Sequence, residues 1–226
     1  LFVLTGTFYN PGPYSGYIAA ILPVALHRML VLNGKKDLLL VVQYYLSLCV
    51  LILICCVLPA GMSRAAWIAS LVSCGYVVLR LYREKIKSFV LRHRYALLGV
   101  LIVGTLFATG MYFIKRDSVD GRLLIWKITT QAIADSPWGV EGGKTFSAFY
   151  GDVQERYFTD CKYSDSEAWV AGTPDFAFNE YLQIAVEYGV WGSVLFVTVL
   201  LMLLKIAGNC KHLAGMGGCL VSLMVF

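Results

Sequence analysis

The chain has 226 residues and a net charge of +5, and 58% of its residues are hydrophobic while only 15% are charged. A soluble domain carries roughly 25% charged residues, and a chain of this size cannot bury so large an apolar excess in one core. The composition therefore excludes a water-soluble enzyme and a disordered or disulfide-stapled chain. It predicts an all-α, polytopic bundle of transmembrane helices.

Long apolar runs follow one another along the chain. A bilayer core of about 30 Å needs about 20 helical residues, and these runs lack the two-residue alternation of a membrane barrel. We expect about six spans, the last of them truncated: Tyr14–Leu32, Leu38–Leu58, Ala65–Tyr82, Tyr95–Ile114, Tyr188–Leu204 and Leu213–Phe226. Because the sequence starts without Met and stops inside an apolar run, we expect it to be an internal segment of a longer protein.

The basic residues between the spans predict the orientation. Six Lys and Arg residues but one Glu lie between Arg80 and Arg94, whereas Lys115–Glu180 holds eleven acidic and seven basic residues. Cytoplasmic loops are enriched in Lys and Arg, so we expect the basic links inside and the long loop outside. The positive charge is thus a topology signal, and we expect no nucleic-acid partner. The expected domains are spans over 1–114, an external loop over 115–187 and spans over 188–226.

The external loop is expected to hold short amphipathic helices that lie at the membrane surface. Apolar residues at helical spacing predict one helix over 121–134 and a second over Phe146–Tyr157. A glycine-rich turn, 138–143, separates them.

A third helix is expected over Pro174–Tyr188, with Thr173 as its N-cap and proline in its first turn. Gly189 and Gly192 would allow a bend before the next span. The polar segment Thr159–Gly172 is expected to be mobile.

Two external arginines run against the charge bias of the chain. Arg64 lies at the outer mouth of the third span, and Arg122 begins the first loop helix. Each is either an interfacial or solvated charge, or an anchor for an anion, since guanidinium binds phosphate with two parallel hydrogen bonds. Together they could clamp a lipid diphosphate.

Other loop residues are weaker candidates. Arg116 and Lys144 could add phosphate contacts, and Trp126 is either an interfacial anchor or a platform for a sugar. Glu180 could act as a general base, or could simply favour the positive end of its helix, and Asn179 beside it is a candidate substrate-binding residue. No metal-binding motif is present, and we expect neither a metal nor a cofactor.

Arg64, Arg122, Trp126, Asn179 and Glu180 belong to motifs that follow one another in a fixed order. These are Met62-Ser-Arg-Ala-Ala-Trp, Gly121-Arg-Leu-Leu-Ile-Trp with Asp135-Ser-Pro-Trp-Gly-Val-Glu-Gly-Gly, and Asn179-Glu-Tyr-Leu-Gln with Glu187-Tyr-Gly-Val-Trp-Gly. In order, spacing and sidedness they resemble the O-antigen ligase and polymerase family of bacterial inner-membrane glycosyltransferases. The resemblance covers most of Thr5–Gly192.

The resemblance implies a multi-pass enzyme of lipopolysaccharide biosynthesis. It would transfer a glycan from an undecaprenyl-diphosphate-linked donor to a lipid, protein or glycan acceptor on the periplasmic face, without a metal. Arg64 and Arg122 would then hold the diphosphate. Many ligases have a His-Asn pair where this chain has Phe178-Asn179, so a base would have to be another group, such as Glu180 or Asp175.

Other functions stay open at this point. The chain could be a polysaccharide polymerase of the same family, or a transporter or flippase for a lipid-linked or polar solute. Carriers coupled to ions normally place ionisable side chains near the bilayer midplane, and between Leu38 and Ile114 the spans hold essentially Arg80 alone. A scaffold with an adhesive loop would leave the external arginines unexplained.

Overall fold

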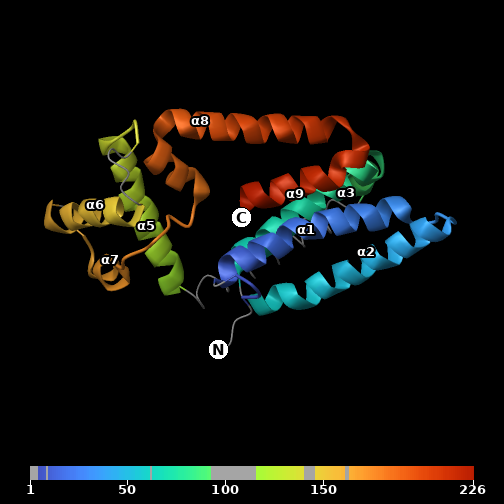
Figure 1. Cartoon of the computed structure of the whole chain (residues 1–226), viewed down its shortest axis with the longest axis horizontal. Helices are drawn as coiled ribbons and strands as arrows, with labels where there is room; N and C mark the ends of the chain where they lie inside the picture. Colours follow the sequence, from blue (N-terminus) through green and yellow to red (C-terminus); the bar gives the residue numbers. More distant parts are fainter. Residues whose placement is uncertain (1–4, 9, 62, 93–115, 140–145, 161–162) are drawn as a thin grey trace. The chain divides into compact units, whose positions relative to one another are not determined.

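The computed structural model describes residues 5–8, 10–61, 63–92, 116–139, 146–160 and 163–226, and these form helices, turns and bends without a strand (Figure 1). The predicted all-α class is confirmed for these residues. The chain divides into two compact units. We call Leu1–His93 with Leu200–Phe226 the membrane-helix unit, and Arg94–Val199 the loop unit.

The membrane-helix unit is built around its first helix. Its elements are α1 (Pro11–Leu32), α2 (Leu38–Val57), the 3-10 turn η1 (Leu58–Gly61), α3 (Arg64–Arg92), the end of α8 (Glu180–Asn209), the 3-10 turn η3 (Lys211–Leu213) and α9 (Ala214–Val225). Helix α1 packs against α2, α3 and α9, and α9 also packs against α3 (Figure 1). Asn10 caps α1, since its side-chain oxygen accepts a hydrogen bond of 2.9 Å from the Gly12 amide.

Glycines let α9 approach its neighbours closely. A Cβ atom on Gly215 would lie 2.9 Å from the His27 Cβ of α1, and one on Gly218 would lie 2.7 Å from both Pro23 and Val77. Helices in membranes associate through such small-residue contacts, because lipid supplies no hydrophobic driving force between them. The His27 ring also lies 3.2 Å from the Lys211 carbonyl oxygen, which ties η3 to α1.

Four described helices are long and apolar enough to cross a membrane: Pro11–Leu32, Leu38–Gly61, Arg64–Ile86 and Glu180–Asn209. They match four of the six predicted spans. The predicted span Tyr95–Ile114 lies outside the described residues, and the last one is a shorter apolar helix, Lys211–Val225.

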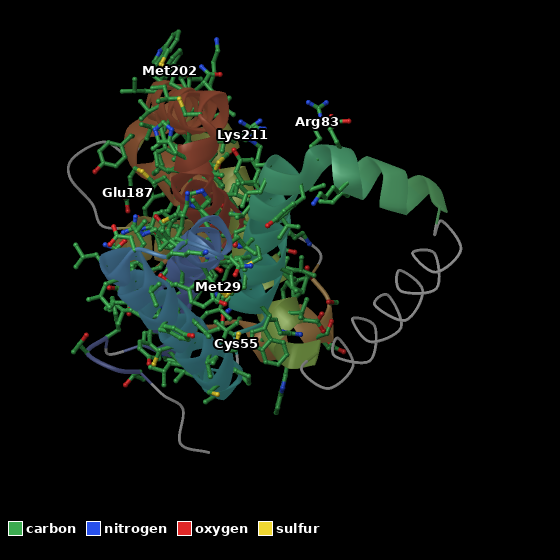
Figure 2. The ribbon with its side chains drawn as sticks, turned by 90° about the vertical axis from the view of Figure 1, so that its right-hand side faces the viewer. Met29, Cys55, Arg83, Glu187, Met202 and Lys211 are labelled. Carbon is green, nitrogen blue, oxygen red and sulfur yellow. The ribbon has the colours of Figure 1, made fainter. Side chains whose placement is uncertain are left out.

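The surface of these helices suits lipid. In α2, whose residues are all described, Ile54 is the one buried side chain. Side chains project outward along the helices, among them Cys55 and Met202 (Figure 2). Apolar exposure on this scale is expected of a surface that contacts the bilayer rather than water.

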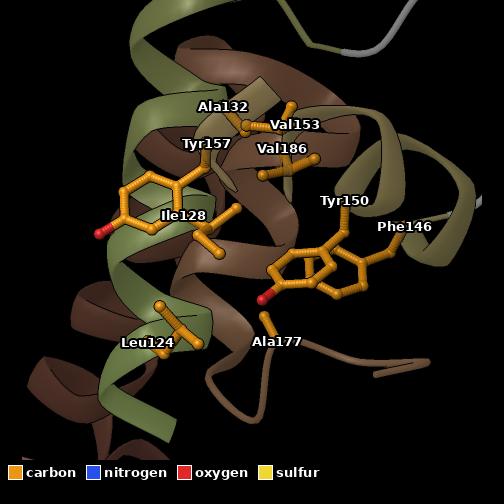
Figure 3. Packing of buried hydrophobic residues seen from close by; sticks show 9 residues of the cluster. All are labelled: Leu124, Ile128, Ala132, Phe146, Tyr150, Val153, Tyr157, Ala177 and Val186. Atoms are coloured by element: carbon orange, nitrogen blue, oxygen red, sulfur yellow. The ribbon is translucent and has the colours of Figure 1, made fainter. Parts of the chain in front are cut away.

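The loop unit holds α5 (Arg116–Asp135), α6 (Phe146–Asp160), α7 (Asp165–Val170) and the first part of α8. Helices α5 and α6 include the ranges 121–134 and Phe146–Tyr157 over which helices were predicted. Their apolar faces meet in one core, shown in Figure 3: Leu124, Ile128, Ala132, Phe146, Tyr150, Val153, Tyr157, Ala177 and Val186. Burying side chains of this size stabilises a fold by about 1.5–3 kcal/mol each.

The sequence predicts a mobile segment over Thr159–Gly172, and the described part of this segment includes a short helix. The segment contains α7, which a capping box begins: the Ser164 hydroxyl accepts from the Glu167 amide, and the Glu167 carboxylate accepts from the Ser164 amide. The Ser-x-x-Glu spacing is a known signature of a helix start, and polar composition alone concealed it.

Candidate active site

Helix α5 presents two of the predicted site residues to the segment that precedes α8. The Trp126 indole donates a hydrogen bond of 3.0 Å to the Ala177 carbonyl. One turn earlier, the Arg122 guanidinium carbon lies 5.4 Å from the centre of the Phe178 ring, a cation–π contact. The site is therefore built by residues that lie more than fifty positions apart in the sequence.

The segment Ala177–Asn179 is also tied to α8. The Asn179 side-chain oxygen accepts hydrogen bonds from the amides of Tyr181 at 3.0 Å and Leu182 at 3.3 Å. The Ala177 amide donates to the Gln183 side chain at 3.3 Å. Asn179, predicted to bind substrate, is thus seen here as the N-cap of α8.

These bonds correct the predicted start of the third loop helix. The helix begins at Glu180 rather than Pro174, and Thr173 is not its N-cap. Asn179 accepts the amide hydrogen bonds of the first turn, so the helix needs no earlier cap. The dipeptide Asn179-Glu180 was itself a cap signal, since Asn ranks among the best N-caps and acidic residues favour the first turn.

Phe178 stands in an uncommon backbone conformation. Its φ is +52°, in the left-handed region that bulky residues rarely adopt. The residue is 48% exposed, and its ring carries the Arg122 guanidinium on its face. Glu180 follows it at the start of α8 and is also exposed. An arginine and a carboxylate therefore flank one short segment at the surface of the loop unit.

Two glycines bring the remaining motifs into backbone contact. Gly189, at φ +68°, breaks α8, and the Val190 amide beyond it donates a hydrogen bond of 3.0 Å to the Pro137 carbonyl. A Cβ atom on Gly139 would lie 3.0 Å from the Gly189 nitrogen. The bend predicted at Gly189 or Gly192 is confirmed at Gly189, and the helix continues through Gly192.

A family model described as O-antigen ligase matches residues 49–197, which is more than half of the chain. The chain belongs to the O-antigen ligase family. A comparison with curated proteins finds no match. The membership supports glycan transfer of the ligase or polymerase kind, and the four apolar helices indicate a multi-pass bacterial membrane protein.

The family match also includes residues that lie away from this segment. Arg64 is partly buried and begins α3 in the membrane-helix unit, so its pairing with Arg122 stays a prediction. Arg116 begins α5, and its side chain lies outside what the structure describes, as does Lys144 altogether. Of the seven predicted site residues of this O-antigen ligase family member, Arg122, Trp126, Asn179 and Glu180 lie at or around one segment.

A polar cluster in the loop unit was missed from the sequence. The Lys127 ammonium donates to the Tyr157 hydroxyl at 2.6 Å and to the Glu167 carboxylate at 2.7 Å. The Lys127 ammonium, and then the Ser164 amide, lower the pKa of Glu167 to about 2. The same bonds raise the pKa of Lys127 above its usual value. Lys127 appeared in the sequence only as one loop charge, and its partner is forty residues away.

Proposed function

We propose that the protein transfers a glycan from an undecaprenyl-diphosphate-linked donor to a lipid, protein or glycan acceptor at the periplasmic face of the bacterial inner membrane. The observation that carries the proposal is the Arg122 guanidinium on the Phe178 ring, beside the capped start of α8 and within the range matched to the family. The charge imbalance of the loop supports its periplasmic placement.

The diphosphate of such a donor is both the group by which the enzyme binds the donor and part of the leaving group. When the acceptor oxygen bonds to the anomeric carbon, the bond from that carbon to the phosphate oxygen breaks, and undecaprenyl diphosphate leaves with the electron pair. Cationic groups placed at the leaving oxygens lower this barrier. We assign this role to Arg122 and Arg64, and the N-terminal position of Arg64 in α3 adds the positive end of a helix.

The acceptor hydroxyl must lose a proton in the same reaction. Glu180 is the carboxylate nearest in sequence to the segment that Arg122 contacts, and its exposure leaves it accessible to an acceptor. We assign it the role of general base. Trp126 positions the segment through its bond to Ala177.

The test is the glycan profile of a strain that lacks the gene, complemented with the wild type, Arg64→Ala, Arg122→Ala or Arg122→Lys. We expect both alanine variants to lose transfer while expression and membrane insertion stay normal. Arg122→Lys should restore little of the glycan transfer that Arg122→Ala loses, because an ammonium cannot bind phosphate with two parallel hydrogen bonds. Arg156→Ala is the matched control, since Arg156 is an exposed arginine on α6.

The same profile separates the candidate reactions. Loss of all capped lipid in the deletion strain means ligation, and caps of a single repeat mean polymerisation. An unchanged ladder with altered substrate uptake would mean a carrier and would overturn the proposal. Full activity in both alanine variants would remove the diphosphate-binding role of the arginines.

A further inference from the structure

A polar pocket lies in the loop unit, on a different face of α5 from Arg122 and Trp126. We propose that it binds one saccharide unit of the glycan that the enzyme handles, an inference that rests on the proposed function. The pocket has a volume of about 290 Å³. Residues of α5 and α7 line it, and those on which the sugar assignment rests are Asp120, Leu123, Lys127, Ser166, Glu167 and Val170.

Lys127 and Glu167, two of the polar groups of the pocket, are held in place before any ligand arrives. Asp120, Leu123 and Lys127 stand at helical spacing on one face of α5. The Lys127 ammonium is fixed by Glu167 at 2.7 Å and Tyr157 at 2.6 Å. Groups that are already ordered lose little conformational freedom on binding, which favours affinity.

The lining has the chemistry that a sugar requires. Carboxylates and a serine hydroxyl can bond to neighbouring sugar hydroxyls, while Leu123 and Val170 offer apolar surface to the C–H face of a ring. Two carboxylates, Asp120 and Glu167, stand against one ammonium, so the pocket disfavours a phosphate. Its volume is near the low end of the roughly 300–1,000 Å³ of small-molecule sites, which suits a single ring.

The pocket is close to the proposed reaction site along the same helix. Lys127 follows Arg122 by five residues, which is about 7.5 Å along the helix axis. Five residues also turn the side chain by about 140° around the axis, so a glycan whose linking diphosphate or attacking hydroxyl lies at Arg122 reaches the pocket by passing around α5, with a sugar further along the glycan. The sugar could belong to the donor or to the acceptor, and both have the same chemistry.

The test uses the whole protein in lipid nanodiscs with Leu123→Trp, which fills the pocket from a half-exposed position, and Asp120→Asn. Ala148→Trp, on the exposed side of α6, is the matched control. We expect the KM for one substrate to rise about ten-fold in both pocket variants, with kcat and the melting temperature unchanged. The substrate whose KM rises, donor or acceptor, identifies the source of the sugar.

A second measurement does not depend on transfer. The probe is the oligosaccharide released by mild acid from the strain's lipid-linked glycan, and the readout is hydrogen–deuterium exchange of α7. We expect slower exchange with the probe in the wild type and in Ala148→Trp, and no change in Leu123→Trp. Wild-type KM values for both substrates and unaltered exchange would overturn the pocket proposal, whereas activity in the arginine variants would overturn the proposed function instead.

Discussion

Phe178 shows how one residue is held against its own preference. A left-handed conformation costs a bulky L-residue about 1–2 kcal/mol, yet the neighbours on both sides fix it: Trp126 bonds to Ala177, and Asn179 caps α8. The consequence is a ring that presents its face to Arg122. Where many ligases have a histidine, this chain has an aromatic face that binds a cation and cannot accept a proton.

Asn179 gives the sharpest prediction for a single residue. Asn179→Ala should destabilise the start of α8 by about 1 kcal/mol, because two amides lose their acceptor. Asn179→Asp should keep that stability, since a carboxylate oxygen accepts the same bonds. Thermal unfolding of the purified protein checks both, and transfer activity is measured beside it.

The aspartate variant separates the two roles of Asn179. If the residue only caps the helix, Asn179→Asp keeps its activity. An inactive but stable Asn179→Asp would instead mean that the amide donates a hydrogen bond to substrate, as the sequence first suggested.

At this scale the sequence could indicate which residues matter but not what they contact. Arg122 and Trp126 stand out by residue type in a loop that the charge pattern predicts to be external. The partner of Trp126 is the carbonyl of Ala177, fifty-one positions away. Every residue has a backbone carbonyl, so the sequence does not show which one accepts the bond. The positive φ of Phe178 was equally hidden, because aromatic residues rarely adopt it.

Among the elements, α5 and α6 were predictable and α7 was not recognised. The apolar spacing of α5 and α6 reflects the core that both helices form. Helix α7 has six residues and none of them is buried, so it has no apolar period to detect. Its capping box and its contact with Lys127 hold it instead.

The short helix should therefore respond to acid. Bonding to Lys127 lowers the pKa of Glu167 from 4.5 to about 2. A lowered pKa means that the stabilising contribution is complete above pH 4.5 and is lost as the pH falls through about 2. Protection of the α7 amides against hydrogen–deuterium exchange, measured relative to the intrinsic exchange rate at each pH, should fall within this window in the wild type.

The control for this prediction is Glu167→Gln. The amide has no proton to gain in this range, so protection of the α7 amides should already be low at neutral pH and should not fall further between pH 4.5 and 2 through this contact. Equal acid responses in the two proteins would contradict the role of the Lys127–Glu167 pair.

For the whole molecule, hydropathy and charge were the sequence properties that predicted the spans and their orientation. Four of the predicted spans coincide with helices that are long and apolar enough to cross a membrane, because local composition alone indicates such a helix. The orientation of the loops could also be predicted from the sequence, because Lys and Arg residues next to the spans are statistically enriched on the cytoplasmic side. The packing of α9 through Gly215 and Gly218 depends on partners in α1 and α3, which composition does not reveal.

Orientation can be tested with a thiol reagent that does not cross membranes. Cys161 is the one cysteine that the sequence places outside. A membrane-impermeant maleimide should label it in spheroplasts of cells that produce the native-length protein, and Cys161→Ser should abolish the label. Labelling that requires permeabilised cells would reverse the predicted topology.

The crossing of Gly139 and Gly189 has an evolutionary consequence. A Cβ atom at Gly139 would collide with the backbone at Gly189, and one at Gly189 would collide with the backbone of Trp138 and Gly139. Neither glycine can therefore be replaced while the backbone at the other stays as it is. Lineages that diverge in substrate should retain the two glycines as a pair or replace both together with an altered connection. Between the two glycines, α6 and the start of α8 supply core residues of the loop unit, so we expect divergence in substrate to appear as substitutions at the exposed positions of these helices while the joint is preserved.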